Sequence, residues 1–232
     1  MTEEKYKANL ICIFPTNLLV SEYPHDFKKE FKFARELDYD NQQITGVFRS
    51  KDTYVLRHPE LEKLKAFFYA SLNTYCESVI GTKHRVNITQ AWVQRNGRGS
   101  FTHEHTHPNS IISGVFYFRN DEQAPINFTK DTINRLTMKQ FKQTKINSES
   151  FTFHPKAGEL ILFPSHLRHN VLINPKEESR YSLAFNSFCF EELGTTESLT
   201  HLNIKEAINE GKSLQDYGAK IYQSNGGRSI KD

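Results

Sequence analysis

The chain has 232 residues and a net charge of only +3, with basic and acidic residues interleaved, so charge does not indicate nucleic-acid binding. This length suits one domain with extensions, and no stretch reaches the ~18 consecutive apolar residues of a membrane span. The charged start lacks the apolar core of a signal peptide, and the three scattered cysteines form no Cys-x-x-Cys pair. Together these features predict a cytoplasmic protein with reduced thiols.

The N-terminal third mixes short apolar runs with helical patterns. Residues 10–16 form an apolar run that contains a proline, which predicts an edge strand. Residues 25–37 carry aromatic residues among charges at roughly helical spacing, and Asp26 is placed to cap such a helix. Residues 43–56 are polar with isolated aromatics, so we expect a loop or an irregular strand there.

The clearest helix begins at Pro59, and its apolar stripe continues to about Val79, just before Gly81. The hydrophobic period then changes to two, which predicts short strands over residues 85–95, 111–118, 124–129, 150–155, 159–164, 169–174 and 180–190. Many short strands separated by turns are typical of a β-sandwich or barrel. We expect a loop excursion or lid at residues 130–150 and two short helices at residues 204–208 and 214–221.

These patterns divide the chain into three parts. Residues 1–82 are expected to supply a strand and supporting helices, residues 83–190 the β-rich core, and residues 191–232 a polar extension. Loops on a rigid barrel often carry specificity, so residues 130–150 and 43–56 are where we expect the substrate to be selected.

Three histidines occur within five residues at the start of a predicted strand: His103, His105 and His107. Alternate residues of an extended chain face the same side, so His105 and His107 can face one metal ion. His169, in a later strand, is the candidate third ligand, and this set predicts a metal site with open positions. The alternatives are a solvated histidine-rich loop and the pair formed by His103 and His105. His154 and His166 are expected to have structural or supporting roles.

Arg180 and Ser182 lie eleven and thirteen residues beyond His169 and share one face of the last predicted strand. A buried arginine needs an anionic partner, and a carboxylate matches its planar fork. The arrangement therefore favours an anion pocket near the metal. The alternative is a salt bridge to Glu177 or Glu178.

These features resemble the iron(II)- and 2-oxoglutarate-dependent dioxygenases, and especially a family of 2-oxoglutarate oxygenases from bacteria and phages. The resemblance covers most of the second half of the chain. It rests on four segments: His105-Thr106-His107-Pro108-Asn109-Ser110, Ser113-Gly114-Val115-Phe116-Tyr117, Phe163-Pro164-Ser165 with His169, and Arg180-Tyr181-Ser182 with Asn186.

The resemblance implies a mainly β, double-stranded β-helix (jelly-roll) fold with supporting N-terminal helices. It makes His105, His107 and His169 ligands of Fe(II), and it makes Arg180 with Ser182 the clamp for the C5 carboxylate of 2-oxoglutarate. Tyr117 and Gln94 are weaker candidates for the same pocket. The expected reaction consumes dioxygen, releases succinate and carbon dioxide, and hydroxylates a protein side chain, a nucleotide or a small metabolite. One departure matters, because the wider superfamily has an acidic second ligand where this chain has His107.

Two alternatives remain open. Cupins share the double-stranded β-helix, and part of their motifs matches the histidine segments, but they do not require Arg180. Their glutamate after the His-x-His pair is also missing here. The second alternative is a non-catalytic barrel that binds a sugar or a protein. Such a barrel would need neither the metal ligands nor the buried arginine. The sequence does not indicate an oligomeric state.

Overall fold

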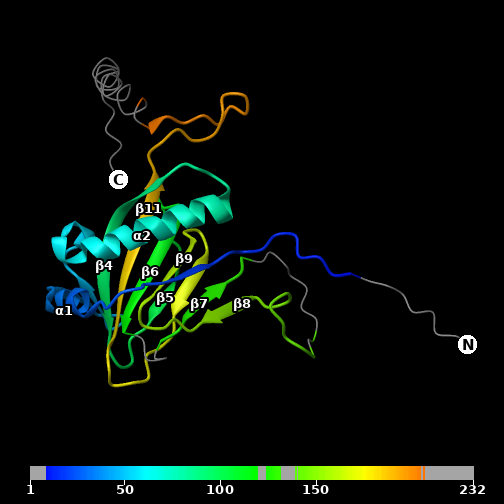
Figure 1. The fold of residues 1–232 in the computed structure, drawn as a ribbon. Helices are drawn as coiled ribbons and strands as arrows, with labels where there is room; N and C mark the ends of the chain where they lie inside the picture. Colours follow the sequence, from blue (N-terminus) through cyan, green and yellow to red (C-terminus); the bar gives the residue numbers. More distant parts are fainter. Residues whose placement is uncertain (1–8, 120–123, 132–138, 140, 205, 207–232) are drawn as a thin grey trace, which may run out of the picture.

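The computed structural model describes every residue except 1–8, 120–123, 132–138, 140, 205 and 207–232. In this part of the chain, two antiparallel sheets pack against each other, and two helices lie across the outer face of the larger sheet (Figure 1). None of the described helices is long and apolar enough to cross a membrane.

The larger sheet has seven strands, in the order β1 (Leu19–Glu22), β9 (Glu159–Pro164), β6 (Ile112–Arg119), β11 (Arg180–Cys189), β4 (Val86–Asn96), β3 (Val47–Ser50) and β2 (Tyr39–Gln42). The smaller sheet has four strands, in the order β5 (Thr102–His105), β10 (Arg168–Val171), β7 (Ile126–Thr129) and β8 (Ser150–Phe153). From β4 onward the chain passes repeatedly between the two sheets, which is the double-stranded β-helix expected from the sequence.

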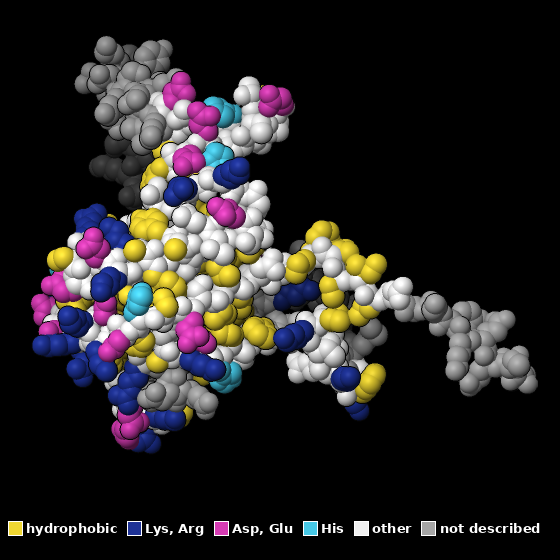
Figure 2. All heavy atoms as spheres, in the orientation of Figure 1, with side chains coloured by type: hydrophobic (Ala, Val, Ile, Leu, Met, Phe, Trp, Pro, Cys, Tyr) yellow, Lys and Arg dark blue, Asp and Glu magenta, His cyan; other side chains and the backbone are white. Residues whose placement is uncertain are grey.

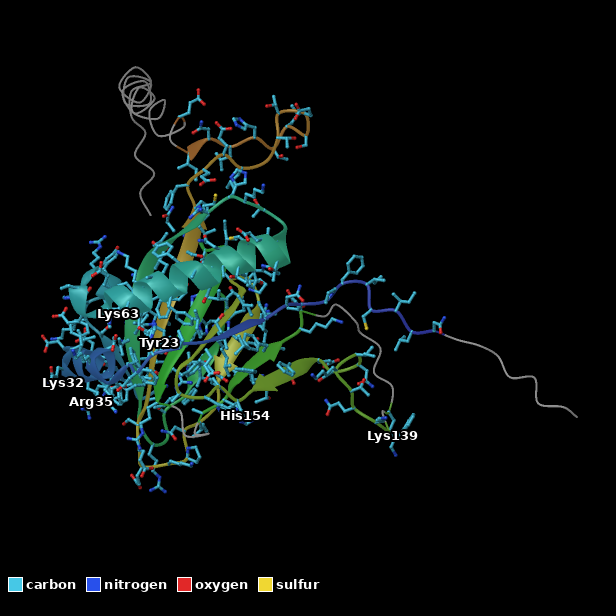
Figure 3. All side chains as sticks on the ribbon, in the orientation of Figure 1. Tyr23, Lys32, Arg35, Lys63, Lys139 and His154 are labelled. Atoms are coloured by element: carbon cyan, nitrogen blue, oxygen red, sulfur yellow. The ribbon has the colours of Figure 1, made fainter. Side chains whose placement is uncertain are left out.

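The helices pack on the larger sheet through aromatic side chains. Helix α1 (Lys28–Glu36) has Phe27, not the predicted Asp26, as its N-cap residue, and Asp26 Oδ1 accepts a hydrogen bond from the Lys28 amide at 3.0 Å just before the helix. Two 3-10 turns, Val55–Arg57 and Pro59–Leu61, precede α2 (Glu62–Tyr75), and a π turn follows over Cys76–Ile80. On α2, Phe68 is fully buried and stacks on Phe185 of β11, with ring centroids 5.1 Å apart. Tyr23, labelled in Figure 3, packs between Phe67 and Phe116.

Gly114 allows the centre of the larger sheet to pack tightly. A Cβ at this position would lie 2.2 Å from Cζ of Phe185, on the neighbouring strand β11. The Phe185 ring therefore occupies the space that any larger residue at position 114 would need.

Two apolar clusters sit on opposite faces of the larger sheet. One lies under the helices, and the other lies between the sheets. The inter-sheet cluster contains Tyr117, Ile126, Phe128, Ile161 and Phe163. Strands β6 and β9 are thus covered on both faces, which explains their nearly continuous apolar sequences.

One prediction for the N-terminal third was wrong. Residues 10–16 form no strand. Leu10, Ile11, Ile13 and Phe14 are exposed on a segment that projects from the body, and the edge strand that pairs with β9 is β1 (Figures 1 and 2). Residues 43–56 agree with the loop or irregular strand expected there: a turn is followed by the short strand β3, which pairs with β2 and β4, and by an irregular segment that leads into the first 3-10 turn. The two helices expected near the C-terminus fall almost wholly outside the described residues.

Candidate functional site

Three histidines meet at one edge of the space between the sheets. His105 ends β5, His107 follows two residues later, and His169 lies on β10 directly opposite His105 in the ladder. One ring nitrogen from each lies within 4.8 Å of the others, and within the described residues this is the one group of three or more potential ligands so arranged. The structure therefore brings together the three histidines that the sequence selected. Imidazole nitrogens are suitable ligands for Fe, Zn, Cu and Ni.

Hydrogen bonds at Nδ1 of His105 and of His169 leave Nε2 of each ring available to bind a metal. His105 Nδ1 lies 2.8 Å from the carbonyl oxygen of His103, and His169 Nδ1 lies 2.9 Å from that of Leu167. A carbonyl only accepts, so each Nδ1 carries the proton and each Nε2 presents a lone pair. Nε2 of His169 lies 3.2 Å from Nε2 of His107. Such backbone contacts fix the tautomer and orientation of metal-binding histidines.

The electrostatic environment keeps two of these rings neutral. Burial, assisted by the charges of His169 and His105, lowers the pKa of His107 to about 3. Burial, with the charge of His105, lowers the pKa of His169 to about 4. Because a metal ligand must be deprotonated, both groups are ready to bind metal at neutral pH.

An irregularity in β5 decides which histidines face inward. His105 pairs with His169 but Thr102 pairs with Val171, so His103 and Glu104 together oppose a single residue of β10. Such a bulge re-aims side chains and is common beside active sites. His103 is exposed and lies outside the cluster, as do the exposed His154 (labelled in Figure 3) and His166.

Glu104 faces away from the histidines, towards Arg168. Its carboxylate lies 3.2 Å from Arg168 Nη1. Hydrogen bonds from Thr129 and Arg168 hold the pKa of Glu104 below its usual range. The one acidic residue inside the histidine segment is therefore engaged elsewhere.

Arg180 is 1% exposed, and its guanidinium group is held by neutral acceptors. Nη1 donates to the carbonyl oxygen of Ala124 at 3.0 Å, while Nη2 donates to Asn96 Oδ1 at 3.2 Å and to Ser182 Oγ at 3.4 Å. Burial lowers the pKa of Arg180, yet a guanidinium stays protonated at neutral pH. The space between the sheets thus contains a fixed positive charge.

The alternative salt bridge does not form. Glu177 pairs with Arg98 at the surface, and the Glu178 carbonyl accepts from Asn174. Among the described residues, no carboxylate lies within ion-pair distance of Arg180. A buried charge without an opposite charge is expensive, so this geometry favours an anionic ligand.

The two weaker candidates for the anion pocket lie beside Ser182. In the larger sheet, Ser182 pairs with Gln94 of β4 on one side and with Tyr117 of β6 on the other. Cζ of Arg180 lies 5.4 Å from the centroid of the Tyr117 ring, and burial raises the pKa of Tyr117 to about 12. Arg180, Ser182, Gln94 and Tyr117 thus form one wall.

Four buried polar atoms around this wall and the histidine cluster lack a hydrogen-bond partner among the described residues: Arg180 Nε, Asn96 Nδ2, Trp92 Nε1 and Thr102 Oγ1. Buried polar atoms are normally satisfied, so a bound ligand or water is the physical expectation. Sequence reasoning missed Asn96 and Trp92. The only available signal was their spacing of two from Gln94 on the same strand. Asn96 pairs with Arg180, and the Trp92 ring lies 6.2 Å from that of His107.

Residues 90–186 match a protein family described as "Putative 2OG-Fe(II) oxygenase". This match confirms the resemblance predicted from the histidine and arginine motifs, and it covers the strands that carry them. Among curated proteins, no sequence matches this chain.

Solved structures with a similar fold include a member of the 2OG-Fe(II) oxygenase family and a prolyl hydroxylase. An oxidoreductase of the 2OG-Fe(II) oxygenase family from Burkholderia pseudomallei aligns with a TM-score of 0.54 at 15% identity, covering 73% of this chain and 83% of that one. HygX from Streptomyces hygroscopicus, with nickel, 2-oxoglutarate and hygromycin B bound, aligns with a TM-score of 0.55 at 11% identity, and the alignment covers 74% of this chain and 82% of that one. A Pseudomonas putida prolyl-4-hydroxylase aligns with a TM-score of 0.52 at 13% identity, and the alignment covers 75% of this chain and 94% of that one. At these identities the likeness establishes the fold.

Proposed function

We propose that this chain, whose residues 90–186 match the 2OG-Fe(II) oxygenase family, is an iron(II)- and 2-oxoglutarate-dependent dioxygenase that hydroxylates its substrate. The observation that carries the proposal is the fully buried Arg180, which has no carboxylate partner among the described residues. It shares the space between the sheets with a cluster of three histidines. Neither a cupin without 2-oxoglutarate nor a simple binding barrel needs that charge.

The residues present fit both groups. Iron(II) accepts imidazole nitrogen, and the lone pairs at Nε2 of His105 and His169 lie on the side where the three rings converge. A 2-oxoglutarate molecule has a distal carboxylate for Arg180 and Ser182. The orphaned Nε of Arg180 and Nδ2 of Asn96 are further donors at that end.

When bound, the metal and cofactor supply an oxidant derived from dioxygen, and one oxygen atom goes to the substrate while 2-oxoglutarate becomes succinate and carbon dioxide. The chain itself positions the reactants. Arg180 and Ser182 orient the cofactor, and the three histidines hold the metal. The apolar wall of Ile161 and Phe163, both fully buried, excludes water from this space.

The neutral ligand at position 107 gives this site its particular character. Three imidazoles add no negative charge, whereas an acidic ligand would add one. The metal site is therefore more positive than a site with two histidines and one carboxylate. We propose that His107 is a true ligand, because its Nε2 lies on the metal-facing side of the cluster.

The test is an anaerobic titration of metal-free protein with iron(II) and then 2-oxoglutarate, monitored by visible absorbance. We expect a new charge-transfer band when 2-oxoglutarate is added, because its 2-oxo acid end chelates the iron. Iron binding without this band would contradict 2-oxoglutarate dependence and favour a cupin-type enzyme. Absence of iron binding would leave a barrel used for recognition.

A further inference from the structure

A hydrogen-bonded network of three serines and one asparagine lies beside the loop that follows His107. Ser113 Oγ of β6 lies 2.8 Å from Ser165 Oγ and donates to Asn186 Oδ1 of β11 at 3.1 Å. Ser165 Oγ also lies 2.7 Å from Ser110 Oγ, in the loop after His107. We call Ser110, Ser113, Ser165 and Asn186 the serine network. Ser113 and Ser165 are 1% and 0% exposed, so water does not compete for these bonds.

The serine network is connected to the metal ligands through the backbone. The His107 amide donates to the carbonyl oxygen of Ser165 at 2.9 Å, and the Ser165 amide donates to the carbonyl of Ile111 at 3.0 Å. Ser165 therefore holds both ends of the loop that begins at His107. At the far end of this loop, the amide of Ser187 donates to Ser110 Oγ at 3.2 Å.

The loop needs this support because its own structure is irregular. His107 lies two residues beyond the end of β5 and so takes no part in the ladder between β5 and β10, the described strand that pairs with β5. Asn109 has a φ of +56°, in the left-handed region that few residues other than glycine adopt. Of the three histidines, His105 and His169 sit in paired strands, whereas His107 depends on contacts from Ser165.

We propose that the serine network is a positioning element of the metal centre, which fixes the backbone at His107 and so sets the direction of the third imidazole. This inference rests on the proposed function, because it assumes that His107 binds metal. Mutation of a residue that orients a metal ligand typically lowers the metal affinity ~10- to 100-fold. The same loss of contacts elsewhere in the fold would lower stability alone.

The test compares Ser165→Ala and Ser113→Ala with Ser50→Ala in the 232-residue chain. Ser50 is a matched control, because it is 1% exposed and bonds to the Asp52 carbonyl at 2.6 Å and the Val93 amide at 3.0 Å, outside the serine network. Cobalt(II) is the probe, since its visible absorption reports coordination geometry. Melting of the metal-free proteins shows that each variant folds. If Ser165→Ala does not fold, Ser113→Ala carries the same comparison.

We expect the network variants to bind cobalt(II) about 10- to 100-fold more weakly than the wild type and to show altered visible bands. Ser50→Ala should keep the wild-type affinity and spectrum even if its melting temperature falls. Wild-type affinity and spectrum in the network variants would overturn the positioning role alone. An equal loss in Ser50→Ala would also overturn it, by showing a general effect of destabilisation. A wild-type protein that binds no cobalt(II) would overturn the metal centre and this inference together.

Discussion

Replacing Arg180 with methionine separates the proposed clamp from the metal site. Methionine keeps much of the volume of the side chain but removes the charge and the donors to Ala124, Asn96 and Ser182. Arg180 lies on β11 of the larger sheet, whereas two of the three histidines lie on strands of the smaller one. We therefore expect Arg180→Met to abolish tight 2-oxoglutarate binding and to leave iron binding near the wild-type value.

The magnitude follows from the burial of the charge. Removing one partner of a buried, hydrogen-bonded charge pair costs about 2–5 kcal/mol of binding free energy. At about 1.4 kcal/mol per tenfold change, the dissociation constant for 2-oxoglutarate should rise roughly 30- to 4,000-fold. Without 2-oxoglutarate, two effects on the free energy of unfolding oppose each other. Arg180→Met removes a buried charge that has no carboxylate partner among the described residues, but it also leaves the acceptors of Ala124, Asn96 and Ser182 without their donor.

The assay is thermal unfolding of the iron(II)-loaded, anaerobic protein with and without 2-oxoglutarate. The wild type should be stabilised by the cofactor, by about 2.7 kcal/mol at a concentration 100 times the dissociation constant. Arg180→Met should melt close to the wild-type temperature without cofactor. At the same 2-oxoglutarate concentration its stabilisation should fall to about 0.9 kcal/mol or less, because its dissociation constant is at least about 30-fold higher. Arg180→Lys retains the charge but loses the fork, and should bind with intermediate affinity. An undiminished shift in Arg180→Met would refute the clamp.

Three further predictions concern the metal site and the sheet. His105→Ala should lower cobalt(II) affinity at least tenfold while His103→Ala should not, measured by titration; an equal effect would contradict the inward register of β5. Metal-free protein should lose stability as pH falls from about 6.5 towards 4, because the unfolded chain binds protons that His107 and His169 do not bind when folded. The limiting slope is about 1.4 kcal/mol per pH unit for each histidine, and a flat denaturant-unfolding profile over this range would argue against their burial. Gly114→Ala should destabilise the fold by at least about 1–3 kcal/mol in the same assay, because its Cβ would overlap a buried ring, and wild-type stability would show that the strands can separate there.

Local sequence determined most of the elements in the core. The change of hydrophobic period after the helix that begins at Pro59 predicted the strands of the double-stranded β-helix, because alternating burial is a property of each strand alone. Local sequence spacing also identified two functional pairs, His105 with His107 and Arg180 with Ser182. Each places two functional groups on one face of an extended chain. The chemistry of these groups could therefore be predicted without knowing how the strands pair.

What the sequence could not decide was set by contacts between distant segments. The bulge that turns His103 away exists only because β5 is matched to β10. The roles of Asn96 and Trp92 depend on the register of β4 against β11. Residues 10–16 illustrate the opposite case, since this apolar run has strand propensity but pairs with none of the described strands. Hydrophobic period is encoded residue by residue, whereas register and the environment of a buried charge arise only when the two sheets close around the site.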